Sequence, residues 1–285
     1  MSKRNILAGA LLAAVAALAL SCGGNNNPSV PSDTLDSDQA TLATFYDPNT
    51  HTTVIGIQDK ASEHPVDLFR GSYDDSLLAA LLPSGAARSA INVFLAQFDD
   101  GPTVLFDAGL GAEDGILSSG KIDPAKVTAV CLTHLHPDHI GGLLQEGKAS
   151  FPNATIYLSK TELASTRQWE STSYVSTLWQ QVLAAYPNRI VTFADSALLF
   201  DGRVQTIPAP GHTSGHTVFQ IGSCLIAGDI LHSQDLQLQH PEFCARYDQD
   251  PARAVATRKQ ILEYVRNNNL QLCGAHCYDF FIKWD

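Results

Sequence analysis

The chain has 285 residues, of which 45% are hydrophobic and 16% charged, so its composition allows a buried core and is not typical of disorder. It carries 18 basic against 29 acidic residues, a formal net charge of −11. A nucleic-acid groove needs a basic surface that displaces counterions from phosphates, so this charge argues against a nucleic-acid partner. The length suits one domain, or one large domain with a terminal extension.

The first 22 residues are predicted to be a targeting segment rather than part of the fold. Lys3 and Arg4 form a positive n-region, and the apolar run 6–20 is shorter than a bilayer-spanning helix. The run ends in Leu-Ser-Cys-Gly, which resembles a bacterial lipoprotein signal with Cys22 as the acylated residue. The alternative is an ordinary secretory signal cleaved nearby. We therefore expect export, with a lipid on Cys22 anchoring the protein at the periplasmic or cell-surface face of a membrane.

Residues 23–39 have the polar, Pro-containing composition of a flexible tether, and residues 40–285 are predicted to form one continuous domain. Five cysteines follow Cys22, and an odd number cannot all pair within one chain. They show no C-x-x-C spacing, so nothing supports a structural zinc knuckle. Cys131 and Cys224 lie in apolar runs, where we expect them to pack as small hydrophobic residues.

The pattern of apolar residues predicts more strands than helices. In chain order, the predicted strands cover residues 52–57, 90–97, 103–106, 126–133, 155–158, 190–193, 204–207, 217–221, 224–227 and 270–275. A short helix is expected to start within 138–144, and an apolar stripe over 175–186 predicts a longer one that ends at Pro187. Asp250 and Pro251 are typical of the first turn of a further helix. Two strand-rich halves closed by helices favour an α+β fold with two packed sheets and helices outside.

The strongest chemical signal is a run of histidines directly after the predicted strand 126–133. His134, His136, Asp138 and His139 fall within six residues. In extended chain, residues i and i+2 point the same way, so His134 and His136 can reach one metal ion together. The turn at Pro137 then directs Asp138 and His139 towards a second position. The alternative, that these histidines form a satisfied polar strand edge, does not account for so many ligand-type residues together.

Zinc needs more ligands than this one segment offers, so partners must come from other loops. Three loops supply a ligand-type side chain just after an apolar strand: His212, Asp229 and His276. In the loop of His212, Gly211 and Gly215 allow the backbone to turn tightly next to a site.

These residues resemble the metallo-β-lactamase superfamily, whose His-x-His-x-Asp-His motif is matched in full at 134–139. The resemblance covers the chain from about residue 50 and implies an αββα sandwich. It implies that one metal ion is bound by His134, His136 and His212, a second by Asp138, His139 and His276, and that Asp229 bridges both. The Pro-Gly-His-Thr-Ser-Gly-His-Thr run at 210–217 is most similar to methyl parathion hydrolases and lactonase-like relatives.

Asp107 lies in a Phe-Asp-Ala-Gly turn that resembles the family's Asp-x-Gly turn, whose carboxylate orients a ligand histidine. The alternative is a plain turn aspartate. One departure from the family concerns residues 277–285: in relatives, the final ligand histidine is followed by a longer segment and a closing strand.

Several other residues have ligand-like or pocket-like character. The resemblance leaves no coordination role for His216 and His232, so we interpret both as structural or as supporting the ligands. Trp169, Trp179 and Phe243 could wall an apolar substrate pocket, although Trp179 lies on the helix stripe and is better explained by core packing.

The predicted function is hydrolysis of an ester, lactone or phosphotriester of a small molecule by a hydroxide bridging two divalent ions, most simply Zn²⁺. Asp138 is expected to transfer a proton in catalysis. A β-lactamase is disfavoured because true metallo-β-lactamases usually lack a bridging Asp at the position of Asp229. A thioesterase of the same fold, a non-catalytic metal-binding lipoprotein and iron-dependent oxygen chemistry remain alternatives.

Overall fold

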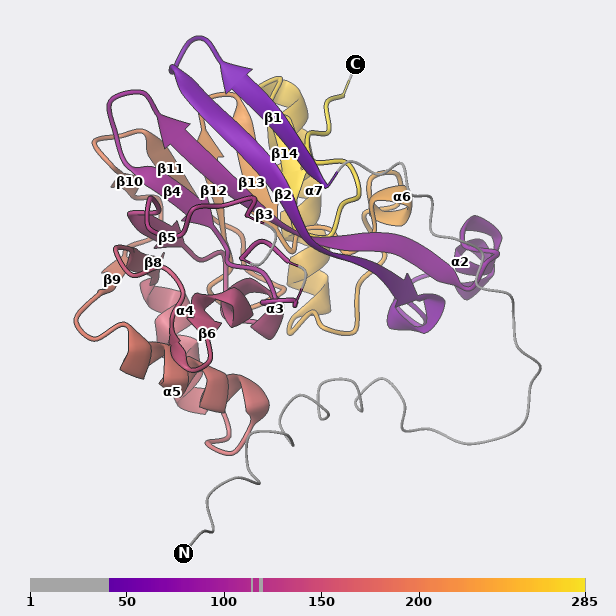
Figure 1. Ribbon diagram of the computed structural model, residues 1–285. Coiled ribbons are helices and arrows are strands. Elements are labelled where there is room, and N and C mark those ends of the chain that lie inside the picture. Colours follow the sequence, from indigo (N-terminus) through magenta and orange to yellow (C-terminus); the bar gives the residue numbers. More distant parts are fainter. Residues whose placement is uncertain (1–40, 114, 118–119, 285) are drawn as a thin grey trace, which may run out of the picture. The chain divides into compact units, whose positions relative to one another are not determined.

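The computed structural model describes residues 41–113, 115–117 and 120–284, and it shows two β-sheets packed face to face with helices outside (Figure 1). The predicted α+β sandwich is therefore confirmed. The predicted signal segment 1–22, with Cys22, and the predicted tether 23–39 lie outside the described residues. Within the described ranges, every helix is too short or too polar to cross a membrane.

The larger sheet has seven strands, and its parallel half carries the loops that matter most. In spatial order the strands are β1 (Leu42–Asp47), β2 (Thr52–Pro65), β3 (Ala86–Phe98), β4 (Thr103–Phe106), β5 (Ala129–Cys131), β8 (Thr155–Ser159) and β9 (Ile190–Phe193). Strands β1 to β4 pair antiparallel, whereas β4, β5, β8 and β9 run parallel. The segments that follow β4 and β5 therefore leave the sheet at the same edge.

The second sheet has five strands: β10 (Leu198–Leu199), β11 (Val204–Pro208), β12 (Thr217–Ile221), β13 (Cys224–Gly228) and β14 (Gln271–Gly274). Only β13 and β14 pair parallel in it, so the loops after these two strands also emerge side by side. A two-stranded ribbon is formed by β6 (Leu144–Gln145) and β7 (Lys148–Ala149).

The described helices are short except for two. They are α2 (Asp75–Leu81), α3 (Pro137–Ile140), α4 (Lys160–Ser165), α5 (Tyr174–Ala185), α6 (Gln234–Gln237) and α7 (Pro251–Asn267), with 3₁₀ turns η1 (Val66–Leu68), η2 (Gly141–Leu143) and η3 (Thr166–Gln168). The helix α7 begins as predicted, because the side chain of Asp250 accepts a hydrogen bond from Arg253 N at 3.1 Å. Helix α5 buries the predicted stripe, including Trp179.

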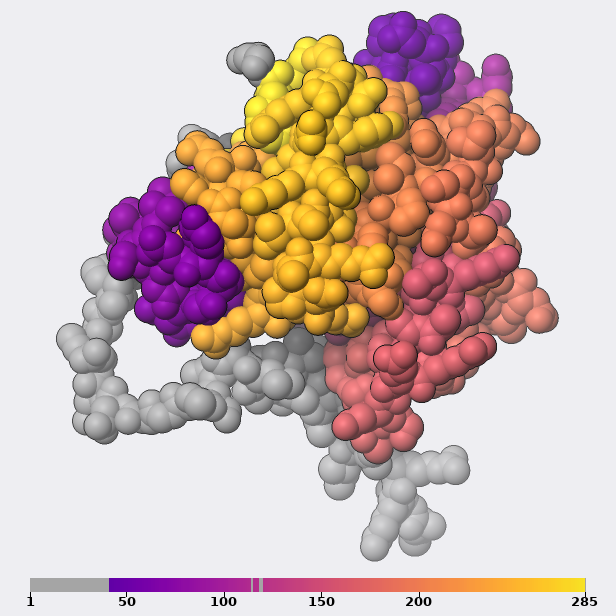
Figure 2. Space-filling model, turned by 180° about the vertical axis from the view of Figure 1, so that it is seen from behind, coloured from indigo at the N-terminus to yellow at the C-terminus, as the bar shows by residue number. Residues whose placement is uncertain are grey.

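Three apolar layers hold the sandwich together. Between the sheets, Phe106 meets Phe219 with ring centroids 5.2 Å apart. Helix α5 packs Trp179 against the outer face of the larger sheet, and α7 packs Leu262 against the outer face of the smaller one. Figure 2 shows α7, in yellow, across the middle of that second face. Burial of each such side chain contributes about 1.5–3 kcal/mol of transfer free energy to the stability of the sandwich.

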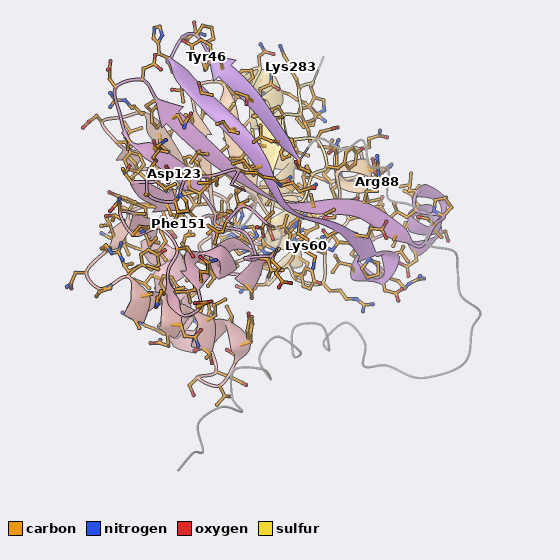
Figure 3. All side chains as sticks on the ribbon, in the orientation of Figure 1. Tyr46, Lys60, Arg88, Asp123, Phe151 and Lys283 are labelled. Atoms are coloured by element: carbon orange, nitrogen blue, oxygen red, sulfur yellow. The ribbon has the colours of Figure 1, made fainter. Side chains whose placement is uncertain are left out.

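The segment after β14 lies along the smaller sheet. Ile282 forms an antiparallel bridge with Leu272, and Phe280 is buried among the side chains between the sheets. The guanidinium of Arg88 on β3 (labelled in Figure 3) stacks 4.0 Å above the Tyr278 ring. The residues that depart from the family pattern after His276 are therefore packed against the sandwich.

Several predicted elements differ in extent from the structure, and several observed elements were not predicted. The strand expected at 126–133 is only Ala129–Cys131, because Lys126 N closes a turn on Asp123 O and Thr133 N bonds to the Asp107 carboxylate instead of a strand. The strand at 52–57 continues to residue 65 as one side of a long hairpin. Strand β1 and helix α2 were missed, because much of each is exposed and the apolar periodicity is weak.

Candidate metal centre

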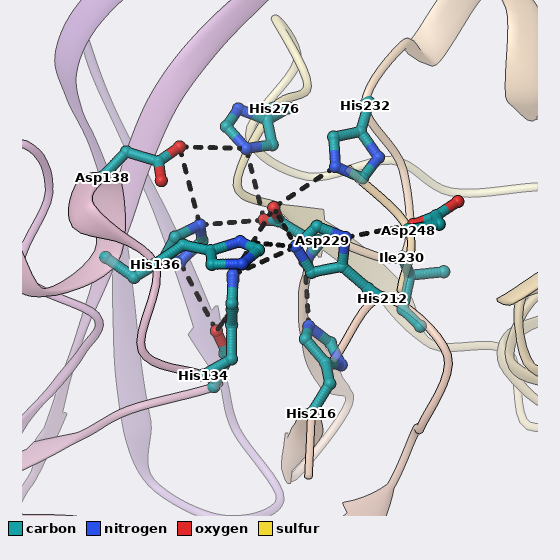
Figure 4. Close-up of polar contacts among 12 residues, drawn as sticks. His134, His136, Asp138, His212, His216, Asp229, Ile230, His232, Asp248 and His276 are labelled. Carbon is teal, nitrogen blue, oxygen red and sulfur yellow. Dashed lines mark hydrogen bonds and ion pairs between the residues drawn. The ribbon is translucent and has the colours of Figure 1, made fainter. Parts of the chain in front are cut away.

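The seven side chains expected to bind metal lie together at one edge of the sandwich, in the loops that follow β5, β11, β13 and β14 (Figure 4). Their ligand-type atoms fall into two groups, and within each group all atoms lie within 4.8 Å of one another. The first group contains His134, His136, His212 and Asp229, and the second contains Asp138, His139 and His276. The structure therefore brings all seven side chains together at one edge of the sandwich.

In the first group, three imidazole rings converge on one point. The Nε2 atom of His212 lies 2.9 Å from Nδ1 of His136 and 3.2 Å from Nε2 of His134. Nε2 of His212 also lies 3.1 Å from Oδ2 of Asp229. Nitrogen lone pairs that face one another at such distances repel unless a proton or a cation lies between them, so this arrangement suits a shared cation.

Asp229 lies between the two groups, with one oxygen turned to each. Its Oδ2 faces His212, whereas its Oδ1 lies 2.9 Å from Nε2 of His139 and 3.2 Å from Nε2 of His276. Nε2 of His276 is in turn 3.4 Å from Oδ2 of Asp138. A carboxylate in this position can contact a cation in either group.

Buried atoms without partners test whether a metal fits. Among the described residues, no hydrogen bond reaches His139 Nε2 or Asp229 Oδ1, although both are buried. Leaving such a group unpaired costs about 1–3 kcal/mol. Imidazole nitrogens and carboxylate oxygens are the donor types that zinc accepts, so a divalent cation would satisfy both atoms.

The positions of the rings are fixed from behind. Asp107, in a left-handed backbone conformation (φ 58°), accepts a hydrogen bond from His139 Nδ1 at 2.7 Å and from Thr133 N at 2.8 Å. His276 Nδ1 donates to the carbonyl of Ala90 at 2.8 Å. In both histidines the Nε2 atom is thereby directed into the site, which is how outer partners orient ligands in metal centres. Asp107 lies where the resemblance placed it.

Asp248 was missed as a site residue. Its Oδ1 accepts a hydrogen bond from His212 Nδ1 at 3.0 Å, and its Oδ2 lies 3.3 Å from Arg258, whose side chain is 1% exposed. Arg258 also donates to the carbonyl of Ile230 at 2.7 Å, just after Asp229. The only local signal in the sequence is the predicted helix start at Asp250 and Pro251, which follows two residues later and does not point to Asp248.

Glu162 was also missed, and it connects two of the ligand loops. Its Oε1 accepts a hydrogen bond from Leu135 N at 3.1 Å, and its Oε2 accepts from Thr213 Oγ1 at 2.7 Å and from Gly215 N at 3.1 Å. The Ser-x-x-Glu pattern at 159–162 could have drawn attention to this residue as a helix-start signal. In the structure, however, the buried carboxylate points away from the helix start and into the loops.

The two histidines that were interpreted as structural differ from each other. His216 Nε2 accepts a hydrogen bond from the backbone N–H of Asp229 at 3.1 Å, which fits a structural role. His232 lies with Nε2 3.4 Å from Asp229 Oδ2 and is 1% exposed. Neither of its ring nitrogens forms a hydrogen bond with any described residue.

Burial and close charges perturb the titration of these groups in opposite directions. Burial, reinforced by the positive charge of His212, lowers the pKa of His136 to about 3. Burial also lowers the pKa of His212, but the carboxylates of Asp229 and Asp248 outweigh it and raise that pKa to about 9. Burial raises the pKa of Asp229, yet the surrounding imidazoles hold it well below its usual value. Negative carboxylates among imidazole nitrogens form a site that attracts cations, and a bound metal ion displaces the protons from the imidazoles.

A cavity of about 360 Å³ opens over the second group. Its described lining residues are His64, Leu110, His136, Pro137, Asp138, Asp229, Tyr247 and His276. None of these is Lys or Arg. Trp169, Trp179 and Phe243 are absent from this lining; the last two are fully buried in core clusters. The expectation that they wall the pocket is therefore wrong, whereas the core role given to Trp179 is confirmed.

The chain is similar to proteins that share this centre's fold. It is 32% identical over 108 residues to the hydroxyacylglutathione hydrolase of Actinobacillus pleuropneumoniae serotype 3 (strain JL03), a match over 38% of this chain and 37% of that protein. The chain thus aligns with little more than a third of the length of that relative.

Solved structures superimpose over more of the chain. A hydrolase of the beta lactamase superfamily named AbOPH matches with a TM-score of 0.74 and 23% identity, covering 86% of this chain and 93% of that one. AidC, a dizinc quorum-quenching lactonase in complex with a product, matches with a TM-score of 0.73 and 22% identity, covering 84% and 91%. At this identity the similarity shows the fold. The family model of the metallo-beta-lactamase superfamily matches residues 87–264, more than half of the chain. The chain therefore belongs to the metallo-beta-lactamase superfamily.

Proposed function

We propose that this chain is a dinuclear metal-dependent hydrolase of an ester, lactone or phosphotriester bond in an uncharged small molecule. The observation that carries the proposal is the position of Asp229, whose two oxygens face two separate groups of ligand-type side chains. We assign one ion to His134, His136 and His212, a second to Asp138, His139 and His276, and Asp229 to both. The donor set suits Zn²⁺, and AidC, a protein of the same fold, is a dizinc enzyme.

When bound, two divalent ions supply a nucleophilic hydroxide at neutral pH and polarise the carbonyl or phosphoryl oxygen of the substrate. The protein's own contribution is positioning and proton transfer. Asp138 is the best placed acid–base group, because its side chain is 27% exposed and lines the cavity while Oδ2 lies 3.4 Å from His276. Such a carboxylate can take the proton of the attacking water and pass it to the leaving group.

The cavity lining supports an uncharged substrate. Leu110, Pro137 and Tyr247 offer apolar surface to a substrate. No lining residue among those described carries the positive charge that an anionic ligand needs. Lactones, aryl esters and phosphotriesters meet this condition. A thioester of glutathione is the second candidate, because relatives of this chain are hydroxyacylglutathione hydrolases, but its carboxylates fit this lining poorly.

The test is hydrolysis by the full-length chain, purified in detergent without chelator and supplied with Zn²⁺. We expect cleavage of at least one of an aryl ester, an N-acyl lactone and a phosphotriester, with a lower kcat/KM for a hydroxyacyl thioester of glutathione. Asp138→Asn should lower kcat by about 10²–10⁴, whereas Asp123→Asn, a matched change at a half-exposed side chain (labelled in Figure 3), should not. Cleavage that survives removal of all metal would contradict the proposal.

We also propose that the protein is exported and held at a membrane by a lipid on Cys22. The support is the sequence alone: a basic n-region, a short apolar run and a cysteine after a small residue, followed by a polar stretch suited to a tether. A single lipid chain binds a membrane only marginally, so an anchor of this kind needs more than one acyl chain.

A further inference from the structure

His232 is a buried residue of the site to which the proposed function gives no role. It follows β13 three residues after Asp229, and it is 1% exposed. It is not among the described residues that line the cavity, so a substrate in the cavity does not reach it. Its role must come from the side chains that surround it.

The other buried histidines at the site each anchor one ring nitrogen. Nδ1 of His139, His212 and His276 bonds to a carboxylate or carbonyl oxygen at 2.7, 3.0 and 2.8 Å respectively. His232 has no such anchor, because both its nitrogens are buried and neither forms a hydrogen bond with a described residue. Each unpaired buried nitrogen costs about 1–3 kcal/mol of stability, so this position of the imidazole is unfavourable unless a further group binds one of its nitrogens.

The surroundings of His232 are those of a ligand. Its Nε2 lies 3.4 Å from Asp229 Oδ2 without the alignment of a hydrogen bond. Its ring stacks on that of His276, with centroids 5.4 Å apart and planes 16° from parallel. Ligand atoms of Asp229, His232 and His276 all lie within 4.8 Å of one another, and Figure 4 shows these three side chains turned towards one another.

A second trio that includes His232 is a poorer site. His212, His232 and Asp248 also offer atoms within 4.8 Å of one another. Both oxygens of Asp248 are already engaged, however, one by His212 Nδ1 at 3.0 Å and the other by Arg258 at 3.3 Å. The positive charge of Arg258 would also repel a cation there, which leaves the position beside Asp229 and His276.

We propose that His232 is an additional metal ligand, which holds a cation together with Asp229 and His276. This rests on the proposed function, because Asp229 and His276 are also assigned to the dinuclear centre. His276 also belongs to the group of Asp138 and His139, whereas the Asp229 oxygen that lies 3.4 Å from His232 is Oδ2, which also lies 3.1 Å from His212 Nε2. Loss of His232 therefore weakens the binding of one of the two ions held by Asp229.

The test is titration of the metal-free full-length protein with Co²⁺, whose visible absorption depends on its coordination. We compare wild type with His232→Ala and with His232→Phe, which keeps a flat ring on His276 but has no nitrogen. His240→Ala is the matched control, because His240 is a partly buried histidine whose Nδ1 lies 3.3 Å from Glu242. Unfolding of the metal-free proteins in urea shows whether each variant folds.

We expect wild type and His240→Ala to bind two Co²⁺ ions with the same spectrum. Both His232 variants should bind one of the two ions at least about 100-fold more weakly, beyond the usual effect of an outer partner, and should change the absorption of that ion. His232→Phe should not lower the stability of the metal-free protein, because it removes two unpaired buried nitrogens. Two ions bound with wild-type affinity and spectrum in both variants would overturn this inference alone. Absence of Co²⁺ binding by wild type would overturn the proposed function as well.

Discussion

The buried carboxylate of Glu162 provides a direct test of how the ligand loops are held. It is 1% exposed and accepts three hydrogen bonds, from Leu135 N, Thr213 Oγ1 and Gly215 N. Replacing it with alanine leaves two backbone N–H groups and one hydroxyl without their partner. The loops that carry His134 and His212 lose their common anchor.

The expected loss of stability follows from these three contacts. A buried donor left unpaired costs about 1–3 kcal/mol, so three cost about 3–9 kcal/mol. The lower half of this range is the better expectation, because the Thr213 hydroxyl can rotate towards another acceptor. Even about 3 kcal/mol is a large share of the 5–15 kcal/mol typical of a folded protein. Glu162→Gln should lower the stability less than Glu162→Ala, because glutamine keeps one acceptor oxygen. It should still be less stable than wild type, because its NH₂ group replaces the other oxygen and faces hydrogen-bond donors.

The assay is urea unfolding of the metal-free protein, together with its affinity for Zn²⁺. Glu162→Ala should lower the unfolding midpoint at unchanged m-value and weaken metal binding by about 10–100-fold, as for loss of an outer partner. Glu170→Ala, a matched change at an exposed position, should stay within about 0.5 kcal/mol of wild type. A Glu162→Ala protein as stable as Glu170→Ala would refute this account of the loops.

Three further predictions concern the core, the sheet edge and the N-terminus. Trp179→Ala should cost about 3–5 kcal/mol in urea unfolding, because the ring is 1% exposed, and should leave metal stoichiometry unchanged. Burial raises the pKa of Asp47, but hydrogen bonds from Ser223 and Asn49 outweigh it and lower that pKa. The stability that Asp47 contributes is therefore present above its unfolded pKa and lost as pH falls through its lowered folded pKa. Asp47→Asn should thus be less stable than wild type at neutral pH, and the difference should shrink as the pH falls through that folded pKa. Cys22→Ala should leave the membrane fraction or remain unprocessed; a variant that fractionates and migrates like wild type would show that Cys22 is not the anchor.

The sequence predicted that the candidate ligands would lie together, because each of their loops follows an apolar strand. The parallel strands β13 and β14 end at the same edge of their sheet. Their pairing therefore brings the loops of Asp229 and His276 side by side. The sequence marks these positions locally, by a polar side chain beside a glycine. The pairing of the sheets then brings them together without any further signal.

Glu162 and Asp248 could not be identified in this way, because their contacts span large separations in sequence. Glu162 reaches residues up to 53 positions away, and Asp248 reaches His212 from 36 positions away. Each also lies near a helix start, which offered a local explanation. Similarly, Asp59 is 3% exposed in a bulge of β2 and accepts hydrogen bonds from Leu110 N and Ile116 N near the cavity, a role that no local pattern indicates.

The bridging position of Asp229 is best tested by elemental analysis of the full-length protein, purified without chelator. We expect close to two transition-metal ions per chain in wild type and in His216→Ala. Asp229→Asn keeps the size of the side chain but removes a negative charge from between the two proposed divalent cations. Asp229 is only 3% exposed, so this charge is poorly screened by solvent. The Asp229→Asn variant should therefore retain close to one metal ion per chain, and its rate of hydrolysis should fall by at least about a hundredfold. Two ions per chain in Asp229→Asn, with activity retained on a substrate of the wild type, would contradict the dinuclear centre proposed for this protein.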